Sequence, residues 1–221
     1  VANSNGIVLV TGPTGSGKTT TLYSSLKRLA TEDVNVCTIE DPIEMVEPAF
    51  NQMQVQANID LHFADGVRAL LRQDPDIIMV GEIRDLETAE MAVQAALTGH
   101  LVISTLHTND APSAITRLLE LGIAPYLIKA TLLGVMAQRL VRILCPHCKV
   151  AAETDVDGWR ALTAPWKMNP PTVSYQPVGC IECRETGFLG REGIYELLPL
   201  SDTIKPFVVV GADTGKLRKS A

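Results

Sequence analysis

The chain alternates between short apolar runs and longer amphipathic stretches, and this alternation predicts strands and helices in turn. Runs of apolar and β-branched residues that end in glycine or in polar residues predict buried strands at residues 6–11, 34–39, 76–80 and 101–106. Apolar residues at helical spacing predict helices at residues 18–30, 63–72, 86–98, 110–121 and 125–138, and the alternation of residues 52–56 predicts a half-exposed strand. Strands that alternate with helices indicate an α/β domain with a mostly parallel sheet and helices on both faces.

The turn between the first strand and the first helix, Gly12 to Thr19, has the pattern G-x-x-x-x-G-K-[ST]. In such a loop glycines allow backbone N–H groups to face phosphate oxygens, Lys18 would neutralise the β- and γ-phosphates, and the Thr19 hydroxyl would bind Mg²⁺. A flexible turn could match by chance, but a preceding strand and a following helix are the context in which the pattern binds a nucleoside triphosphate. The candidate nucleotide-binding residues are Gly12, Pro13, Thr14, Gly15, Ser16, Gly17, Lys18, Thr19 and Thr20.

Length and charge narrow the classes of protein. The 221 residues suffice for one substantial core and a smaller module. A formal net charge of −6 gives no support to nucleic-acid binding as the main task. No apolar run reaches the roughly 18 residues that a membrane-spanning helix needs, and no signal peptide is visible. Because the first residue is Val1 rather than Met, we expect a piece of a longer protein.

Acidic residues follow two of the predicted strands. Glu40, Asp41 and Glu44 follow the second strand, and Glu82 follows the third after one glycine. Because ligands of α/β sheets bind beyond the carboxyl ends of strands, we expect these acids near the γ-phosphate. Glu82 is favoured over Asp76, which lies at the beginning of its strand, as the acid that acts on Mg²⁺. For the first three acids a solvated acidic turn is the alternative.

Two histidines flank the fourth predicted strand. His107 follows its end, the same position that the acids occupy on their strands, so a sensor of the γ-phosphate is favoured over a structural histidine. His100 precedes the strand, and for it the structural and the catalytic interpretations stand equal.

Four cysteines form two C-x₂-C pairs, Cys145 with Cys148 and Cys180 with Cys183, separated by a spacer of 31 residues. Two such pairs can hold one Zn²⁺ in a tetrahedron, and metal binding is favoured over disulfides in an acidic chain without a signal peptide. The alternatives are two redox pairs, two disulfides, or His147 in place of one cysteine ligand.

Four sequence blocks together resemble a known family. GPTGSGKT, TIEDPIE (residues 38–44), RQDPDIIMVGEIRD (residues 72–85) and TGHLVISTLHTND (residues 98–110) are similar to the Walker A, Asp-box, Walker B and His-box signatures of the type II secretion and type IV pilus assembly ATPases. The resemblance covers essentially the whole chain and implies a P-loop fold of the RecA type. It also implies that Glu44 activates the attacking water, that Glu82 acts on Mg²⁺ and its waters, and that His107 lies near the γ-phosphate. Assembly-type members of the family carry a tetracysteine zinc module.

The resemblance further implies a biological setting. We expect an ATP-hydrolysing motor subunit of a bacterial type II secretion system, which powers pseudopilus assembly and protein export as a cytoplasmic hexameric ring. Its expected partners are an inner-membrane platform protein and cytoplasmic adaptor proteins, with membrane association only through them and no nucleic acid. A type IV pilus assembly motor is the nearest alternative, and a nucleic-acid translocase of the same core a more distant one.

The expected domain division follows from the motifs. Residues 1–144 form the P-loop core, residues 145–184 the cysteine module, and residues 185–221 a return segment with a small helical C-terminal region. Because the family's upstream domain supplies arginines to the nucleotide, we expect the isolated chain to hydrolyse ATP only weakly, with Mg²⁺.

Overall fold

The computed structural model describes residues 5–164 and 166–220, which divide into two compact units. The first unit extends to Arg139 and resumes at Tyr195, and the second unit is Leu140–Ile194. The second unit contains the four paired cysteines and extends beyond the expected residues 145–184 on both sides.

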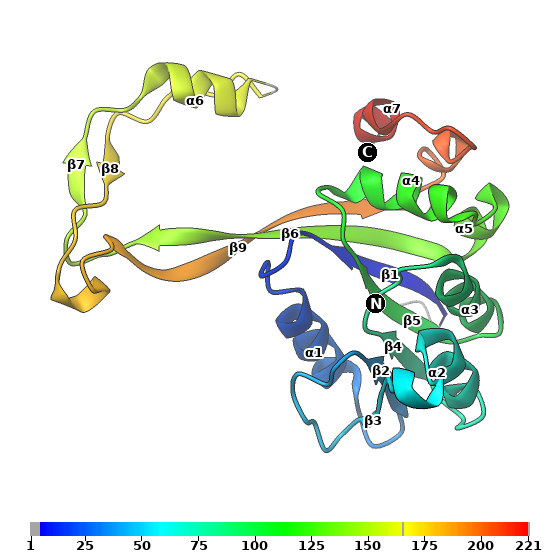
Figure 1. The fold of residues 1–221 in the computed structure, drawn as a ribbon. Helices are drawn as coiled ribbons and strands as arrows, with labels where there is room; N and C mark the ends of the chain where they lie inside the picture. The colour runs from blue at the N-terminus through cyan, green and yellow to red at the C-terminus, as the bar shows by residue number, and fades with distance from the viewer. Residues whose placement is uncertain (1–4, 165, 221) are drawn as a thin grey trace. The chain divides into compact units, whose positions relative to one another are not determined.

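A seven-stranded sheet has the order β3-β2-β4-β5-β1-β6-β9 (Figure 1). Strand β1 pairs in parallel with β5 and β6, and β4 pairs in parallel with β2 and β5, so that the predicted α/β class is confirmed. The strands are β1 (Gly6–Thr11), β2 (Val36–Glu40), β3 (Asn51–Gln54), β4 (Ile77–Val80), β5 (Leu101–Leu106), β6 (Leu132–Leu144) and β9 (Phe188–Pro199).

Apolar side chains on both faces of the sheet explain why its central strands are continuous apolar runs. Every residue of β2, β4 and β5 is buried. Ile78 and Val80 belong to one core cluster, whereas Ile77 and Met79 belong to the other. Because successive strand residues point to opposite faces, the two clusters lie on the two sides of the sheet.

The helices of the first unit supply the covering layers of the sheet. The smaller cluster includes Leu22 and Leu26 of α1, and the larger cluster includes residues of α2, α3, α4 and α5. Aspartates cap two of these helices, since Asp85 accepts from the Thr88 N–H and Asp110 from the Ser113 N–H, each at 2.8 Å. The helices are α1 (Lys18–Leu29), α2 (Phe63–Leu70), α3 (Leu86–Leu97), α4 (Ala111–Leu121), α5 (Pro125–Thr131) and α7 (Thr214–Ser220), with short 3-10 turns η1 (Ala57–Ile59) and η3 (Lys205–Phe207).

The helix predicted for residues 125–138 is wrong in its second half. The helix α5 ends at Thr131, and the chain continues as β6 beside β1. A continuous apolar run fits a buried strand as well as a buried helix, and periodicity cannot separate the two. Glycine within a strand often marks a place where another backbone approaches closely. This holds for Gly134, where a Cβ would lie 3.0 Å from the Leu198 carbonyl oxygen of β9.

The second unit has little regular structure of its own. It contains the antiparallel strands β7 (Val150–Ala152) and β8 (Ser174–Gln176), the helix α6 (Val156–Thr163) and the 3-10 turn η2 (Ile181–Cys183). Among the residues that the structure describes in either unit, no helix is both long and apolar enough to cross a membrane.

Candidate functional site

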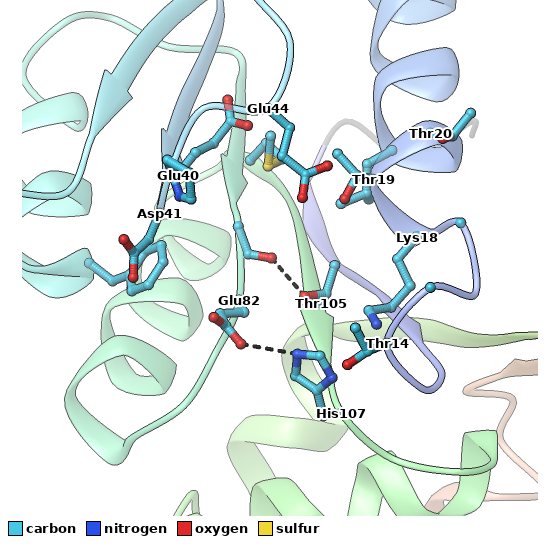
Figure 2. A pocket seen from close by; sticks show the side chains of 17 residues that line it. Thr14, Lys18, Thr19, Thr20, Glu40, Asp41, Glu44, Glu82, Thr105 and His107 are labelled. Carbon is cyan, nitrogen blue, oxygen red and sulfur yellow. Dashed lines mark hydrogen bonds and ion pairs between the residues drawn. The ribbon is translucent and has the colours of Figure 1, made fainter.

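A pocket of about 360 Å³ lies where the glycine-rich loop meets the carboxyl ends of β2, β4 and β5 (Figure 2). Residues from all four sequence blocks line it. Its lining includes Thr14, Gly15, Gly17, Lys18, Thr19, Thr20, Glu40, Asp41, Glu44, Glu82, Thr105 and His107. Of the candidate residues in the glycine-rich loop, Gly12, Pro13 and Ser16 do not line the pocket.

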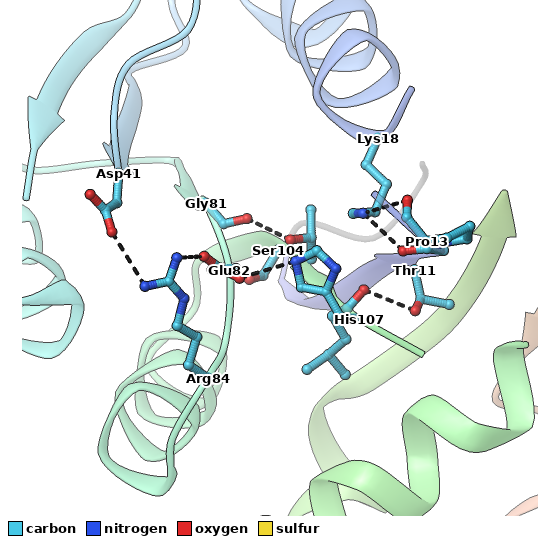
Figure 3. Close-up of polar contacts among 12 residues, drawn as sticks. Thr11, Pro13, Lys18, Asp41, Gly81, Glu82, Arg84, Ser104 and His107 are labelled. Carbon is cyan, nitrogen blue, oxygen red and sulfur yellow. Dashed lines mark hydrogen bonds and ion pairs between the residues drawn. The ribbon is translucent and has the colours of Figure 1, made fainter. Parts of the chain in front are cut away.

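The glycine-rich loop has the backbone that its pattern predicts. Gly12, Gly15 and Gly17 have φ angles of 146°, 76° and 84°, in the region that favours glycine. The Lys18 Nζ donates to the Gly12 and Pro13 carbonyls at 2.9 and 3.2 Å, which folds the side chain back over the loop (Figure 3). Burial lowers the pKa of Lys18, and the carboxylates of Glu82 and Glu44 oppose that change.

On the side of the pocket away from the glycine-rich loop, charged side chains that follow β2, β4 and β5 contact one another in a row. The Glu82 carboxylate contacts the His107 Nε2 at 3.2 Å and forms an ion pair with Arg84 (Figure 3). Arg84 also reaches Asp41 at 3.3 Å and lies over the ring of Phe63. The hydrogen bond that Arg84 donates to the Glu82 carboxylate, together with the nearby charges of Glu82 and Asp41, raises the pKa of Arg84. Walker B and His-box residues are therefore in direct contact.

The three acids that follow the second predicted strand have different surroundings. Glu40 is buried, with 4% of its surface exposed, and accepts hydrogen bonds from Tyr23 and Thr38. Asp41 pairs with Arg84. Glu44 is exposed, and its carboxylate is directed toward Thr19 (Figure 2). Within the described ranges, no hydrogen bond or ion pair engages the Glu44 carboxylate, which leaves it available to a ligand.

His100 has the surroundings of a structural histidine. Its Nδ1 lies 2.9 Å from the Ala95 carbonyl oxygen and 3.1 Å from the Thr98 hydroxyl, at the end of α3. It does not line the pocket that contains His107.

Gln138 of β6 holds the glycine-rich loop, although no sequence pattern singles it out. Its Nε2 donates to the Ser16 carbonyl at 2.8 Å, and its Oε1 accepts from the Thr21 hydroxyl at 2.8 Å. A Cβ on Gly12 would lie 2.3 Å from the Gln138 carbonyl oxygen, so that glycine is required at residue 12 for packing as well as for its φ angle. The sequence carries no signal for Gln138, which lies in the segment that was predicted as helix.

The second unit gathers its four cysteines into one cluster. Their sulfur atoms all lie within 4.8 Å of one another, and three of the pairs are 3.7, 3.8 and 3.9 Å apart. Disulfide-bonded sulfurs are about 2.05 Å apart, so these are free thiols. A tetrahedral Zn²⁺ with bonds of about 2.3 Å to sulfur requires sulfur–sulfur distances of about 3.8 Å. The donor set and its spacing therefore fit zinc.

Backbone donors favour the thiolate form of one cluster member. Burial opposes ionisation of Cys183, but the N–H groups of Cys180 and Gly187 donate to its sulfur at 3.2 Å each. Together with hydrogen bonds from the Cys180 and Cys148 side chains, these donors outweigh burial and lower the pKa of Cys183 to about 6. A thiolate is the form that binds a metal ion.

Comparisons with known proteins agree with these motifs. A family model described as type II/IV secretion system protein matches residues 1–221. The chain belongs to this family. It is 67% identical to the type IV pilus assembly ATPase TfpB of Acinetobacter baylyi over 219 residues, which are 99% of this chain and 37% of that protein. It is 53% identical to the type II secretion system protein HxcR of Pseudomonas aeruginosa over 221 residues, which are 100% of this chain and 43% of that protein.

Solved structures of the family share the fold. The ATPase DotB of Legionella pneumophila matches with a TM-score of 0.66 and 29% identity, over 99% of this chain and 52% of that chain. The pilus retraction motor PilT, in a structure with bound ADP, matches with a TM-score of 0.66 and 33% identity, over 97% of this chain and 52% of that chain. This chain therefore spans less than half of the two curated relatives named above and about half of these two structures.

We expect Gln138→Leu to weaken nucleotide binding, because the Ser16 carbonyl and the Thr21 hydroxyl would lose their buried partner. An unpaired buried group costs about 1–3 kcal/mol, so the dissociation constant for ADP should rise about tenfold. Titration with a fluorescent ADP analogue measures it. Gln94→Leu on the exposed side of α3 is the matched control, and equal affinities for the two variants would show that Gln138 does not support the loop.

Proposed function

We propose that this chain is the nucleotide-hydrolysing part of an ATP-driven motor subunit of a bacterial type II secretion system. The observation that carries the proposal is one pocket in which Lys18 and Thr19 face Glu44, Glu82 and His107. Relatives named as type II secretion proteins support it, among them the type II secretion system ATPase E of Vibrio cholerae, 52% identical over 94% of this chain. A type IV pilus assembly motor is the second candidate, which the 67% identity to TfpB favours.

The residues of the glycine-rich loop are suited to the phosphates of ATP. Backbone N–H groups of the loop, the start of α1 and the Lys18 ammonium would bind the β- and γ-phosphates. The Thr19 hydroxyl would hold Mg²⁺, with Glu82 acting on the ion and its waters. Bound Mg²⁺ neutralises charge that develops on the phosphate oxygens. ADP in the PilT structure is consistent with this assignment.

The side chains that follow the strand ends have the remaining roles in hydrolysis. Glu44, whose exposed carboxylate points into the pocket, orients and activates the water that attacks the γ-phosphate. His107, which contacts Glu82, senses the γ-phosphate in this proposal. Thus the acid on Mg²⁺ and the acid on water stand on different strand ends, and one can be changed without the other.

We also propose the setting that the family resemblance implies. The motor acts as a hexameric ring in the cytoplasm, peripheral at the inner membrane through a platform protein and cytoplasmic adaptor proteins. Residues 1–221 alone bind nucleotide but hydrolyse it slowly, because the family's upstream domain supplies arginines to the nucleotide. Arginines from outside the glycine-rich loop commonly accelerate phosphoryl transfer by about 10³ to 10⁵. In the second unit Cys145, Cys148, Cys180 and Cys183 hold a structural Zn²⁺, for which their geometry is suited.

We expect Glu44→Gln and Glu82→Gln to have different defects in ATP hydrolysis. Glu44→Gln keeps the metal acid, so it should bind ATP with Mg²⁺ almost normally and hydrolyse it at least about a hundredfold more slowly. Glu82→Gln should in addition require more Mg²⁺ for half-maximal activity, because the acid that acts on the ion is lost. Activity at graded Mg²⁺ concentrations measures both. Superimposable Mg²⁺ titrations would remove support for this division of roles.

Protein purified without chelator should contain about one zinc per chain, measured by elemental analysis. Cys148→Ser should lose the metal and increase proteolysis within residues 145–183, while ADP affinity stays near that of the native protein, because the metal holds the second unit only. Cys37→Ala, a buried thiol outside the cluster replaced without adding a polar group, is the control for a lost thiol. Absence of zinc, or two disulfides in the native protein, would overturn the zinc assignment.

A further inference from the structure

A buried acidic side chain in the wall of the pocket has no part in the chemistry described so far. Glu40, the last residue of β2, accepts hydrogen bonds from the Tyr23 hydroxyl at 2.7 Å, the Thr38 hydroxyl at 2.7 Å and the Gln52 Nε2 at 3.1 Å. These donors offset the large cost of removing a carboxylate from water. Burial and the bond to Glu40 raise the pKa of Tyr23, so its hydroxyl stays protonated and donates at neutral pH.

The same donors also hold the backbone beside Glu44. The Tyr23 hydroxyl and the Gln52 Nε2 each lie 2.9 Å from the Met45 carbonyl oxygen, one residue after Glu44. The Gln52 Oε1 accepts from the Glu47 N–H at 2.7 Å. On the other side, the Gln54 Oε1 accepts from the Ile43 N–H at 3.2 Å. The backbone is therefore fixed on both sides of Glu44, while the Glu44 side chain is exposed to the pocket.

Tyr23 connects this arrangement to the metal side of the site. It lies four residues after Thr19 on α1, so the two side chains share one face of the helix. Its ring is buried, with 2% exposed, and packs against Phe50 with the ring centres 5.8 Å apart. A second link from the same helix is the ion pair of Lys27 with Glu47. Tyr23 therefore links α1, the helix that carries Thr19, to the loop that carries Glu44.

We propose that Tyr23 and Gln52, together with the buried Glu40, are positioning residues that fix the Glu44 carboxylate relative to Lys18 and Thr19. This rests on the proposed function, in which Glu44 activates the water. A displaced Glu44 leaves the phosphate-binding groups in place, so the positioning residues act on the rate of hydrolysis and not on nucleotide affinity. Tyr23 donates to Glu40 or to Met45 through a single hydrogen, and Gln52 supplies the other donors. Loss of either residue therefore loosens the same loop.

Tyr23→Phe removes one oxygen and keeps the ring that packs on Phe50, which makes it the sharpest test. In the full-length protein we expect kcat for ATP to fall about tenfold, because a small misplacement of a catalytic group has a large effect on rate. The dissociation constant for ADP should change by less than about twofold. Combined with Glu44→Gln, the substitution should lower kcat no further, since the group that it positions is already gone.

Two further variants complete the test. Tyr126→Phe, on a tyrosine that is 70% exposed, should retain native kcat. Gln52→Met removes the amide at similar side-chain length and should reproduce the loss of kcat. If Tyr23→Phe melts at a much lower temperature than the native protein, Gln52→Met decides the test in its place. Native kcat in both Tyr23→Phe and Gln52→Met, beside an inactive Glu44→Gln, would overturn the positioning role alone. An equal further loss in the Glu44→Gln background would also overturn it, because the residues would then act independently. A fully active Glu44→Gln would instead overturn the proposed role of Glu44 itself.

Discussion

Parallel pairing of the central strands is the constraint on which the site depends. In the sheet, β2, β4, β5 and β1 are adjacent in this order and run parallel. Their carboxyl ends therefore meet at one edge of the sheet. The four loops that follow carry Glu44, Glu82, His107 and the glycine-rich segment. Thr14 and His107, which are 93 positions apart in the sequence, thereby lie around one pocket. Burial of both faces of the sheet stabilises the pairing and keeps this edge rigid.

Two polar networks then orient the side chains at that edge. On one side, Arg84 connects Asp41 with Glu82, and Glu82 contacts His107. On the other side, Tyr23 and Gln52 connect the buried Glu40 with the backbone beside Glu44. The first network includes groups that would face the nucleotide. In the second, Glu40 lines the pocket, and Tyr23 and Gln52 hold the backbone beside Glu44. Satisfied networks of this kind restrict a site to one arrangement.

Local patterns in the sequence predicted the parts of the site that lie at strand ends. The glycine-rich loop, Glu82 and His107 each follow an apolar run, and the parallel sheet turns that local feature into a shared position. The spacing of the cysteines likewise predicted the cluster that the second unit forms. In contrast, Gln138 and Gln52 look like ordinary polar residues, and only partners that are 122 and 29 positions away give them their roles. The first half of β6, residues 132–138, is predicted as helix because an apolar run carries no period that separates the two.

Whether the glycine-rich loop binds ATP for hydrolysis is tested by the turnover of Lys18→Ala. Steady-state ATP hydrolysis should be compared among the native full-length protein, this variant, and Lys216→Ala, which removes an exposed lysine from α7. We expect a loss of at least about a hundredfold for Lys18→Ala, because the charge that stabilises the transferred phosphoryl group is gone. Lys216→Ala should keep native turnover. Undiminished hydrolysis by Lys18→Ala would show that the glycine-rich loop does not bind ATP for hydrolysis.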